Sequence, residues 1–242
     1  LLMRRRALVA PWGDLRRGAL TTLVRSTVLQ LRRLPNDPRN WRPNILLFAG
    51  DVDRRPNLVR FAAWLVQDRG ILTVADLRVG SLPELGPSVG EWKKALNLQL
   101  EGLGVSAFGE IEVVPEFVSG AVAVAQANGI AGIESNTVMF GWTDKPERCA
   151  DQLRIIEELS TLGIGAVICR SKSLDAGAGK KRTIDVWWGG LQANGDMLAL
   201  FAHLLSLNPE WRDSSITIKS IATSEMMLER NRQLLDRMIS SA

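Results

Sequence analysis

The sequence contains no tyrosine, one histidine and two cysteines, and these scarcities exclude several kinds of site. Without tyrosine, one common general acid is missing. Cys149 and Cys169 stand far apart and belong to no CxxC pair or Cys/His cluster, so we expect no zinc site. Two scattered cysteines are typical of a reduced, cytoplasmic protein, with one disulfide between them as the open alternative.

Long apolar runs are also missing. No run approaches the roughly 20 residues that a transmembrane helix needs, and no secretory signal is visible. The sequence starts at Leu1, and Met3 is followed directly by three arginines. From this start we expect a chain cut from a longer protein, with these arginines near the cytoplasmic end of a membrane span.

The single histidine is a weak candidate for a catalytic residue. His203 lies in the apolar helical segment 200–205, where a structural histidine is more common than a catalytic base. No GxSxG, HExxH or SxxK motif accompanies it. We therefore expect no catalysis, and a hydrolase or transferase has the least support of the functions considered.

Acidic residues and glycines make a weak case for a nucleotide site. Asp51 and Asp53 follow an apolar strand, where a carboxylate pair could hold Mg²⁺ or a ribose. We favour the alternative that they stabilise the start of a helix near Pro56. The glycines of 129–132 and 177–181 lack the order and spacing of a phosphate loop, so we expect no cofactor.

Positive charge is concentrated before the first strand. The net charge is +4, and the arginines concentrated in this part of the chain include Arg4, Arg5, Arg6, Arg16, Arg17, Arg25, Arg32, Arg33 and Arg39. An apolar stripe over 14–34 predicts an amphipathic helix, with Asp14 as its cap. The arm is either solvated or held near anionic lipid. We expect no nucleic acid, since stacking aromatics are not interleaved with the basic residues.

Apolar runs and helical periodicity alternate along the rest of the chain. Strands are predicted over 44–50, 71–79, 111–114, 137–142, 164–170, 182–188 and 215–223, and helices over 56–69, 91–103, 115–128, 146–162, 194–207 and 225–240. This alternation predicts an α/β fold with mainly parallel sheets flanked by helices. We expect an arm over 1–43 and two similar halves, 44–143 and 144–242.

The penultimate strand carries an acidic residue and two tryptophans. Asp185 should be paired or lie at a sheet edge, because an unpaired buried carboxylate is costly. Trp187 and Trp188 should point to opposite faces of the strand. We expect core packing for one of them and contact with a second layer or a partner subunit for the other.

Six segments, in order, resemble the cytosolic C-terminal domain of cation–chloride cotransporters of prokaryotic type. The segments are WGDLRRG (12–18), NWRPN (40–44), RPNLV (55–59), SNTVMFGW (135–142), TIDVWW (183–188) with DMLAL (196–200), and Trp211 with ITI (216–218). These transporters belong to the amino acid–polyamine–cation superfamily. The chain lacks the long insertions of animal members, which leaves no place for kinase control through them.

The resemblance implies two halves like universal stress proteins, a homodimer, and a place at the cytoplasmic face of the cell membrane. It implies a regulatory role in the coupled movement of chloride with sodium or potassium, next to the protein's own transmembrane domain. The ion sites would lie in that domain, so no ion-binding residue is carried over. The residues expected at the linker and interface are Trp12, Asp14, Arg16, Arg17, Trp187 and Trp188.

A stand-alone nucleotide-binding stress-type protein is the alternative. Its candidate residues are Asp51, Asp53 and Gly141. Universal stress proteins often bind ATP through a glycine-rich loop after the fourth strand. Here Gly141 begins GWTDKP at that place, which lacks the loop, and we expect no strong ATP site of that type.

Overall fold

The most apolar strand of the sequence forms the middle of a parallel sheet. The computed structural model describes residues 12–35, 41–130, 133–171, 182–188 and 194–240. Five parallel strands lie in the order β3-β2-β1-β4-β5, and their bounds are β1 (Ile45–Phe48), β2 (Leu72–Val79), β3 (Phe108–Val114), β4 (Thr137–Gly141) and β5 (Gly165–Cys169). All four residues of β1 are buried, as its continuous apolar run predicts.

Two pairs of helices cover the two faces of this sheet. On one face α2 (Pro56–Val66) and α3 (Leu82–Gly102) bury Leu65 and Leu100 against Leu47. On the other, α4 (Phe117–Ala127) and α5 (Pro146–Ser160) pack with Leu46 and Phe140. Because side chains alternate along a strand, each central strand supplies both layers. The predicted α/β fold, with a parallel sheet flanked by helices, is confirmed.

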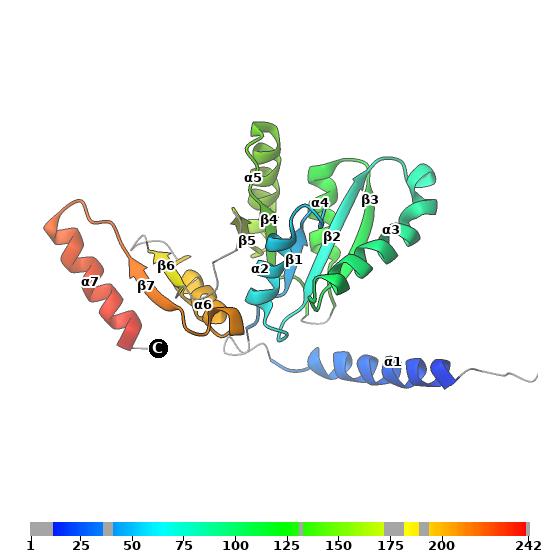
Figure 1. The fold of residues 1–242 in the computed structure, drawn as a ribbon, viewed down its shortest axis with the longest axis horizontal. Coiled ribbons are helices and arrows are strands. Elements are labelled where there is room, and N and C mark those ends of the chain that lie inside the picture. The colour runs from blue at the N-terminus through cyan, green and yellow to red at the C-terminus, as the bar shows by residue number, and fades with distance from the viewer. Residues whose placement is uncertain (1–11, 36–40, 131–132, 172–181, 189–193, 241–242) are drawn as a thin grey trace, which may run out of the picture.

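A smaller sheet forms beside α2. Strands β6 (Thr183–Trp187) and β7 (Ser215–Lys219) pair in parallel, joined through α6 (Asn194–Ser206) and the 3-10 helix η2 (Pro209–Trp211), and α7 (Glu225–Ser240) follows. The Asn208 amide donates to the Trp64 carbonyl of α2 at 2.9 Å. Trp64 and Trp211 meet edge to face, with ring centroids 5.7 Å apart. These contacts hold the small sheet and α6 against the face of the large sheet that α2 covers (Figure 1).

Helix α1 (Trp12–Leu31) precedes both sheets and extends away from them, at the opposite end of the molecule from α7 (Figure 1). The helix predicted over 14–34 is thus present with slightly earlier bounds. Among the described helices, none combines the length and apolar character that a bilayer crossing requires.

Two asparagines fix the point where the chain enters β1. Asn136 Oδ1 accepts from the Asn44 N–H at 3.1 Å, and Asn136 Nδ2 donates to the Arg42 carbonyl at 2.7 Å. Asn44 Oδ1 accepts from the Ile71 N–H at 3.0 Å. This asparagine bracket (Asn44 and Asn136) ties the starts of β1, β2 and β4 together. Its members come from two of the segments that carry the family resemblance, 40–44 and 135–142.

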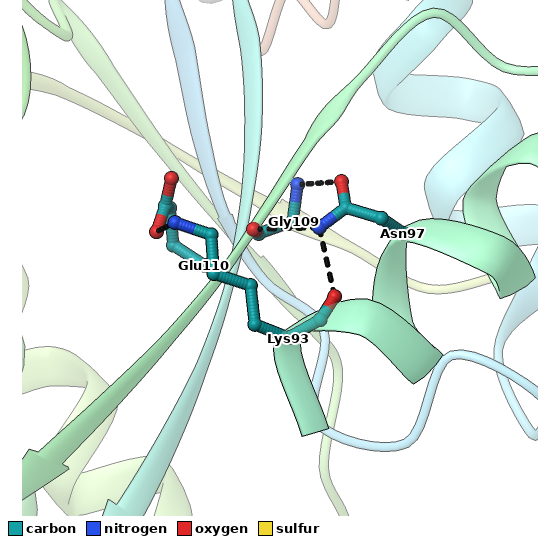
Figure 2. Close-up of polar contacts among 4 residues, drawn as sticks. All are labelled: Lys93, Asn97, Gly109 and Glu110. Carbon is teal, nitrogen blue, oxygen red and sulfur yellow. Dashed lines mark hydrogen bonds and ion pairs between the residues drawn. The ribbon is translucent and has the colours of Figure 1, made fainter. Parts of the chain in front are cut away.

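One side chain occupies the outer edge of β3. Asn97 of α3 accepts from the Gly109 N–H at 3.0 Å and donates to the Gly109 carbonyl at 3.1 Å (Figure 2). Lys93 pairs with Glu110 beside it. A Cβ at Gly109 would lie 2.8 Å from Leu96, so glycine lets α3 approach this closely. The backbone groups of Gly109 at this edge are therefore already used.

Two expectations about the elements differ from the structure. Helix α3 starts at Leu82 instead of 91, because Gly86, Pro87 and Gly90 interrupt its helical signal. Strand β5 pairs with β4 in the large sheet, although its residues follow 143. Sequential strands joined by a helix commonly become neighbours. Residue 143 is therefore not the end of the large sheet, the two sheets differ in size, and the domain boundaries stay a prediction.

Candidate functional site

A basic cleft lies at the carboxyl ends of β1, β4 and β5. The helices after β1 and β4 cover opposite faces of the sheet, which opens a crevice between the two strand ends. The cleft has a volume of about 270 Å³. Its lining residues are Arg54, Arg55, Pro56, Asn57, Leu58, Gly141, Trp142, Asp144, Cys169, Arg170 and Ser171.

Gly141 shapes the floor of this cleft. A Cβ at Gly141 would lie 2.7 Å from Arg55 Nη1 and 3.0 Å from Leu58, so a larger residue would displace the guanidinium. The Gly141 carbonyl accepts from Gln152 Nε2 at 3.0 Å and points away from solvent. Of the three nucleotide candidates, Gly141 alone lines the cleft.

Two guanidinium groups give the cleft its positive charge. Within the described residues, neither Arg55 nor Arg170 forms a salt bridge. Arg170 lies 5.6 Å from the Trp142 ring centroid, and Trp142 Nε1 donates to Asp144 at 2.9 Å. The N-terminus of α2 opens here with Arg55 as its cap and no side-chain bond. Such an arrangement favours an anion.

Asp51 and Asp53 lie outside the cleft lining. Asp51 pairs with Arg54 at 3.0 Å and accepts from the Asp53 N–H at 3.1 Å. Asp53 accepts from Gln99 of α3 at 2.7 Å. The favoured prediction that these acids cap the helix at Pro56 is wrong, because Asp51 instead closes its own short turn. In the described part of the chain, no group of three or more His, Cys, Asp or Glu residues is placed to hold a metal.

The two cysteines and the histidine do not converge on a reactive site. Cys149 and Cys169 are both free thiols. Burial raises the pKa of the Cys169 thiol, so at neutral pH it is the poorly nucleophilic, protonated form. His203 is exposed on α6, away from the residues that line the cleft.

Trp187 ends β6 and Trp188 follows it, and the two side chains differ in exposure. Trp187 is 59% exposed, and Lys219 Nζ lies 5.7 Å from its ring centroid. Lys219 also pairs with Asp185 at 2.6 Å, which satisfies that carboxylate. Trp188 is half-buried against Gly195 at the start of α6. The free face of Trp187 is thus available to a partner.

The remaining expected residues lie in the arm or outside the described residues. Arg16 and Arg17 are exposed on α1, whereas Trp12 and Asp14 are placed only as part of its backbone. The structure does not describe residues 1–11 or the glycine-rich segment 177–181. The sequence analysis missed Arg55 and Arg170, whose signal is a basic residue shortly after each of two parallel strands.

The fold and the cleft define a doubly wound parallel α/β protein. No protein-family model matches the chain. Among solved structures, the crystal structure of the cytoplasmic domain of a prokaryotic cation chloride cotransporter is similar, with a TM-score of 0.57 and 15% sequence identity. The match covers 83% of this chain and 74% of that chain. At this identity the likeness is one of fold.

Proposed function

We propose that this chain is a cytosolic regulatory and dimerisation domain of a secondary transporter that couples chloride to sodium or potassium movement. The observation that carries the proposal is the fold shared with the cytoplasmic domain of a cation chloride cotransporter over 83% of the chain. The ordered motifs support it, since two of them meet in space as the asparagine bracket.

Exposed apolar surface supports the dimer. Large apolar side chains are exposed after β7, where Ile221 is 69% exposed, Met226 84% and Leu228 58%. A groove of about 680 Å³ lies between β7 and α7. Trp187 adds an aromatic side chain of the kind that often dominates binding energy at interfaces.

Sedimentation tests the dimer. The chain should sediment at twice its 26.6 kDa monomer mass at micromolar concentration. Trp187→Ala should weaken the dimer about tenfold or more, as expected for an interface aromatic. Trp142→Ala is a matched control, because Trp142 is also exposed and also lies beside a cation. A monomer at all concentrations, or equal effects of the two variants, would contradict the dimer.

The transport role is tested separately. The coding sequence upstream of Leu1 should encode several apolar spans of about 20 residues each. In vesicles, the complete protein should move sodium or potassium only when chloride is present, and Trp187→Ala should change the rate without removing this dependence. An initiator methionine at Met3 would overturn this role.

The cleft supports a second candidate, a stand-alone protein that binds a nucleotide. Arg55, Arg170 and the start of α2 would hold phosphate. The cleft of about 270 Å³ is smaller than the pockets of roughly 300–1,000 Å³ that take drug-sized ligands, so we rank this candidate second.

Titration calorimetry with ATP and Mg²⁺ distinguishes the candidates. Micromolar binding that Arg55→Gln or Arg170→Gln weakens by about tenfold or more would favour the nucleotide. Asp51→Ala is the control, because Asp51 does not line the cleft. No heat of binding at millimolar ATP would remove this candidate.

A further inference from the structure

We propose that α1 binds flat on the surface of a bilayer that contains anionic lipid. No described part of the chain covers its apolar face: Leu20 is 62% exposed, Leu23 63% and Val24 59%. These residues recur at helical spacing with Thr27 and Leu31, so they form one stripe along the helix. The inference rests on the chemistry of α1 and does not depend on the transport role.

The charge of α1 selects an anionic surface. Arg16, Arg17 and Arg25 are exposed on the helix, and Arg32 and Arg33 follow it directly. No acidic residue occurs between Asp14 and Asp37. Arg25 and Arg32 are seven residues apart and lie away from the apolar stripe, with the exposed Leu29 between them, whereas Arg16 lies four residues before Leu20 on the side of the stripe. A basic face beside an apolar face is the pattern of helices that lie in the headgroup region.

The polar side chain within the apolar stripe is already satisfied. Thr27 Oγ1 donates to the Leu23 carbonyl at 2.9 Å. Outside the stripe, Thr21 and Thr22 donate to the Arg17 and Gly18 carbonyls at 2.8 and 2.9 Å. Burying the stripe in acyl chains therefore leaves no unpaired hydroxyl, which would otherwise oppose burial.

The position of Arg25 decides how the helix lies. With 20 residues, α1 is about 30 Å long, enough to cross a hydrocarbon core. A crossing would bury Arg25 in that core, which is costly. Lying in the plane keeps Arg25 and Arg32 near the phosphates while Leu20 and Leu23 enter the acyl region.

Helix α7 provides a comparison within the same chain. It also exposes large apolar residues, Met226 and Leu228. Its charges are mixed, however, because Glu225, Glu229 and Asp236 accompany its arginines. The proposal therefore assigns lipid binding to α1 and not to α7.

Vesicle flotation tests the proposal with the whole chain. At about 0.1 M salt the chain should float with vesicles of phosphatidylcholine mixed with phosphatidylserine, and much less with phosphatidylcholine alone. Raising the salt to about 1 M should release most of it, since the screening length falls from about 10 Å to about 3 Å. Equal flotation on both vesicles, or none on either, would overturn the proposal.

Paired variants locate the site. Arg25→Gln with Arg32→Gln should lower partition about 25-fold, since each arginine near an anionic surface contributes about fivefold. Arg25→Lys with Arg32→Lys should retain most of the binding, because the charge is kept. Arg230→Gln with Arg232→Gln removes the same charge from α7 and should leave flotation unchanged. Circular dichroism checks that all variants are folded. Equal losses of vesicle binding in the α1 and α7 variants would contradict the assignment to α1.

Other partners that could bind the apolar stripe of α1 would give different experimental results. If a second copy covers α1, Leu20→Gln with Leu23→Gln would turn a dimer into a monomer, and the arginine variants would leave the dimer unchanged. If nucleic acid is the partner, single-stranded oligonucleotides would bind at the affinity of the vesicles and compete with them. Either result would overturn the proposal.

Discussion

The side-chain amide of Asn97 forms hydrogen bonds at the outer edge of β3, where a neighbouring strand would otherwise pair. The backbone N–H and carbonyl of Gly109 both bond to it. Asn97→Ala should lower the free energy of unfolding by about 1–3 kcal/mol, because it leaves both groups unpaired at a half-buried position. Urea denaturation measures this cost. Lys94→Ala, exposed on the same helix, should change stability by less than about 0.5 kcal/mol, and equal costs would contradict the assigned role.

Glu116 caps α4 and makes its stability depend on pH. Backbone hydrogen bonds from Ser119 and Val118 hold the pKa of this carboxyl below its usual value of 4.5. The lowered pKa means that the cap stabilises the fold above the unfolded-state pKa. This stability is lost as the pH falls through the folded-state pKa.

Thermal melts across the acidic range should reveal the Glu116 cap. Glu116→Gln should lower the melting temperature at pH 7 and flatten the dependence of stability on pH below about 4.5. Glu116→Asp keeps a charged cap and should keep the slope. An unchanged slope in Glu116→Gln would show that the cap does not contribute.

Single residues of the candidate site were the hardest to predict. Gly141 is the last residue of β4 and lines the cleft. Asp51 also follows a strand but does not line the cleft. Its carboxylate instead accepts from the Asp53 N–H in a local turn and pairs with Arg54. Arg55 and Arg170 line the same cleft because β1 and β5, which are far apart in the sequence, end at the same edge of the sheet. The local sequence does not show the order of strands in a sheet.

At the scale of elements, apolar patterns predicted every described strand, because buried parallel strands read as continuous apolar runs. They did not predict which strands pair. Strand β5 joins β4 through the crossover of α5, and its short apolar run carries no information about that neighbour. Helix α3 was shortened in the prediction because glycines and a proline mask its first turns.

Asn208 joins the end of α6 to α2. Its amide donates to the Trp64, Leu204 and Leu205 carbonyls at 2.9, 3.0 and 3.0 Å. Asn208→Ala should cost about 1–3 kcal/mol, because the Trp64 carbonyl loses this side-chain donor, whereas the Leu204 and Leu205 carbonyls keep bonds from Gln67 and from the backbone N–H of residue 208. Hydrogen exchange should rise in α6 more than in β1.

The control for Asn208 lies at the same helix end. Ser206 bonds only within α6 among the described contacts, donating to the His203 carbonyl at 2.8 Å. Ser206→Ala should therefore leave exchange in α2 and α6 near that of the parent chain. If both variants loosened α6 equally, the bond to Trp64 would not be the contact that matters.

Across the whole molecule, the two sheets differ in how well they are supported. The large sheet has helices on both faces, and Ile45, Leu46 and Leu47 of β1 are 0% exposed. The small sheet has two strands, and two-stranded sheets are marginal without packing. Under native conditions, exchange should be slowest in β1 and β4 and faster in β6 and β7. Equal protection in β1 and β7 would show a single cooperative unit.

The fold class could be predicted at this scale because alternating strands and helices permit few architectures. The number of strands in each sheet could not be predicted from the sequence. The prediction described two similar halves, whereas the strands form one sheet of five and one of two. Packing of α6 on α2 depends on Trp64, Trp211 and Asn208, which are far apart in sequence.

The asparagine bracket also has a mechanical consequence. It sits where the chain coming from α1 enters β1, the middle strand of the large sheet, which is hydrogen-bonded to β2 on one side and β4 on the other. A force that pulls on α1 is therefore transmitted to both β2 and β4. The backbone hydrogen bonds between β1 and these two strands then resist it together, in shear. Force from that end would move the large sheet as a rigid block before any strand peels away.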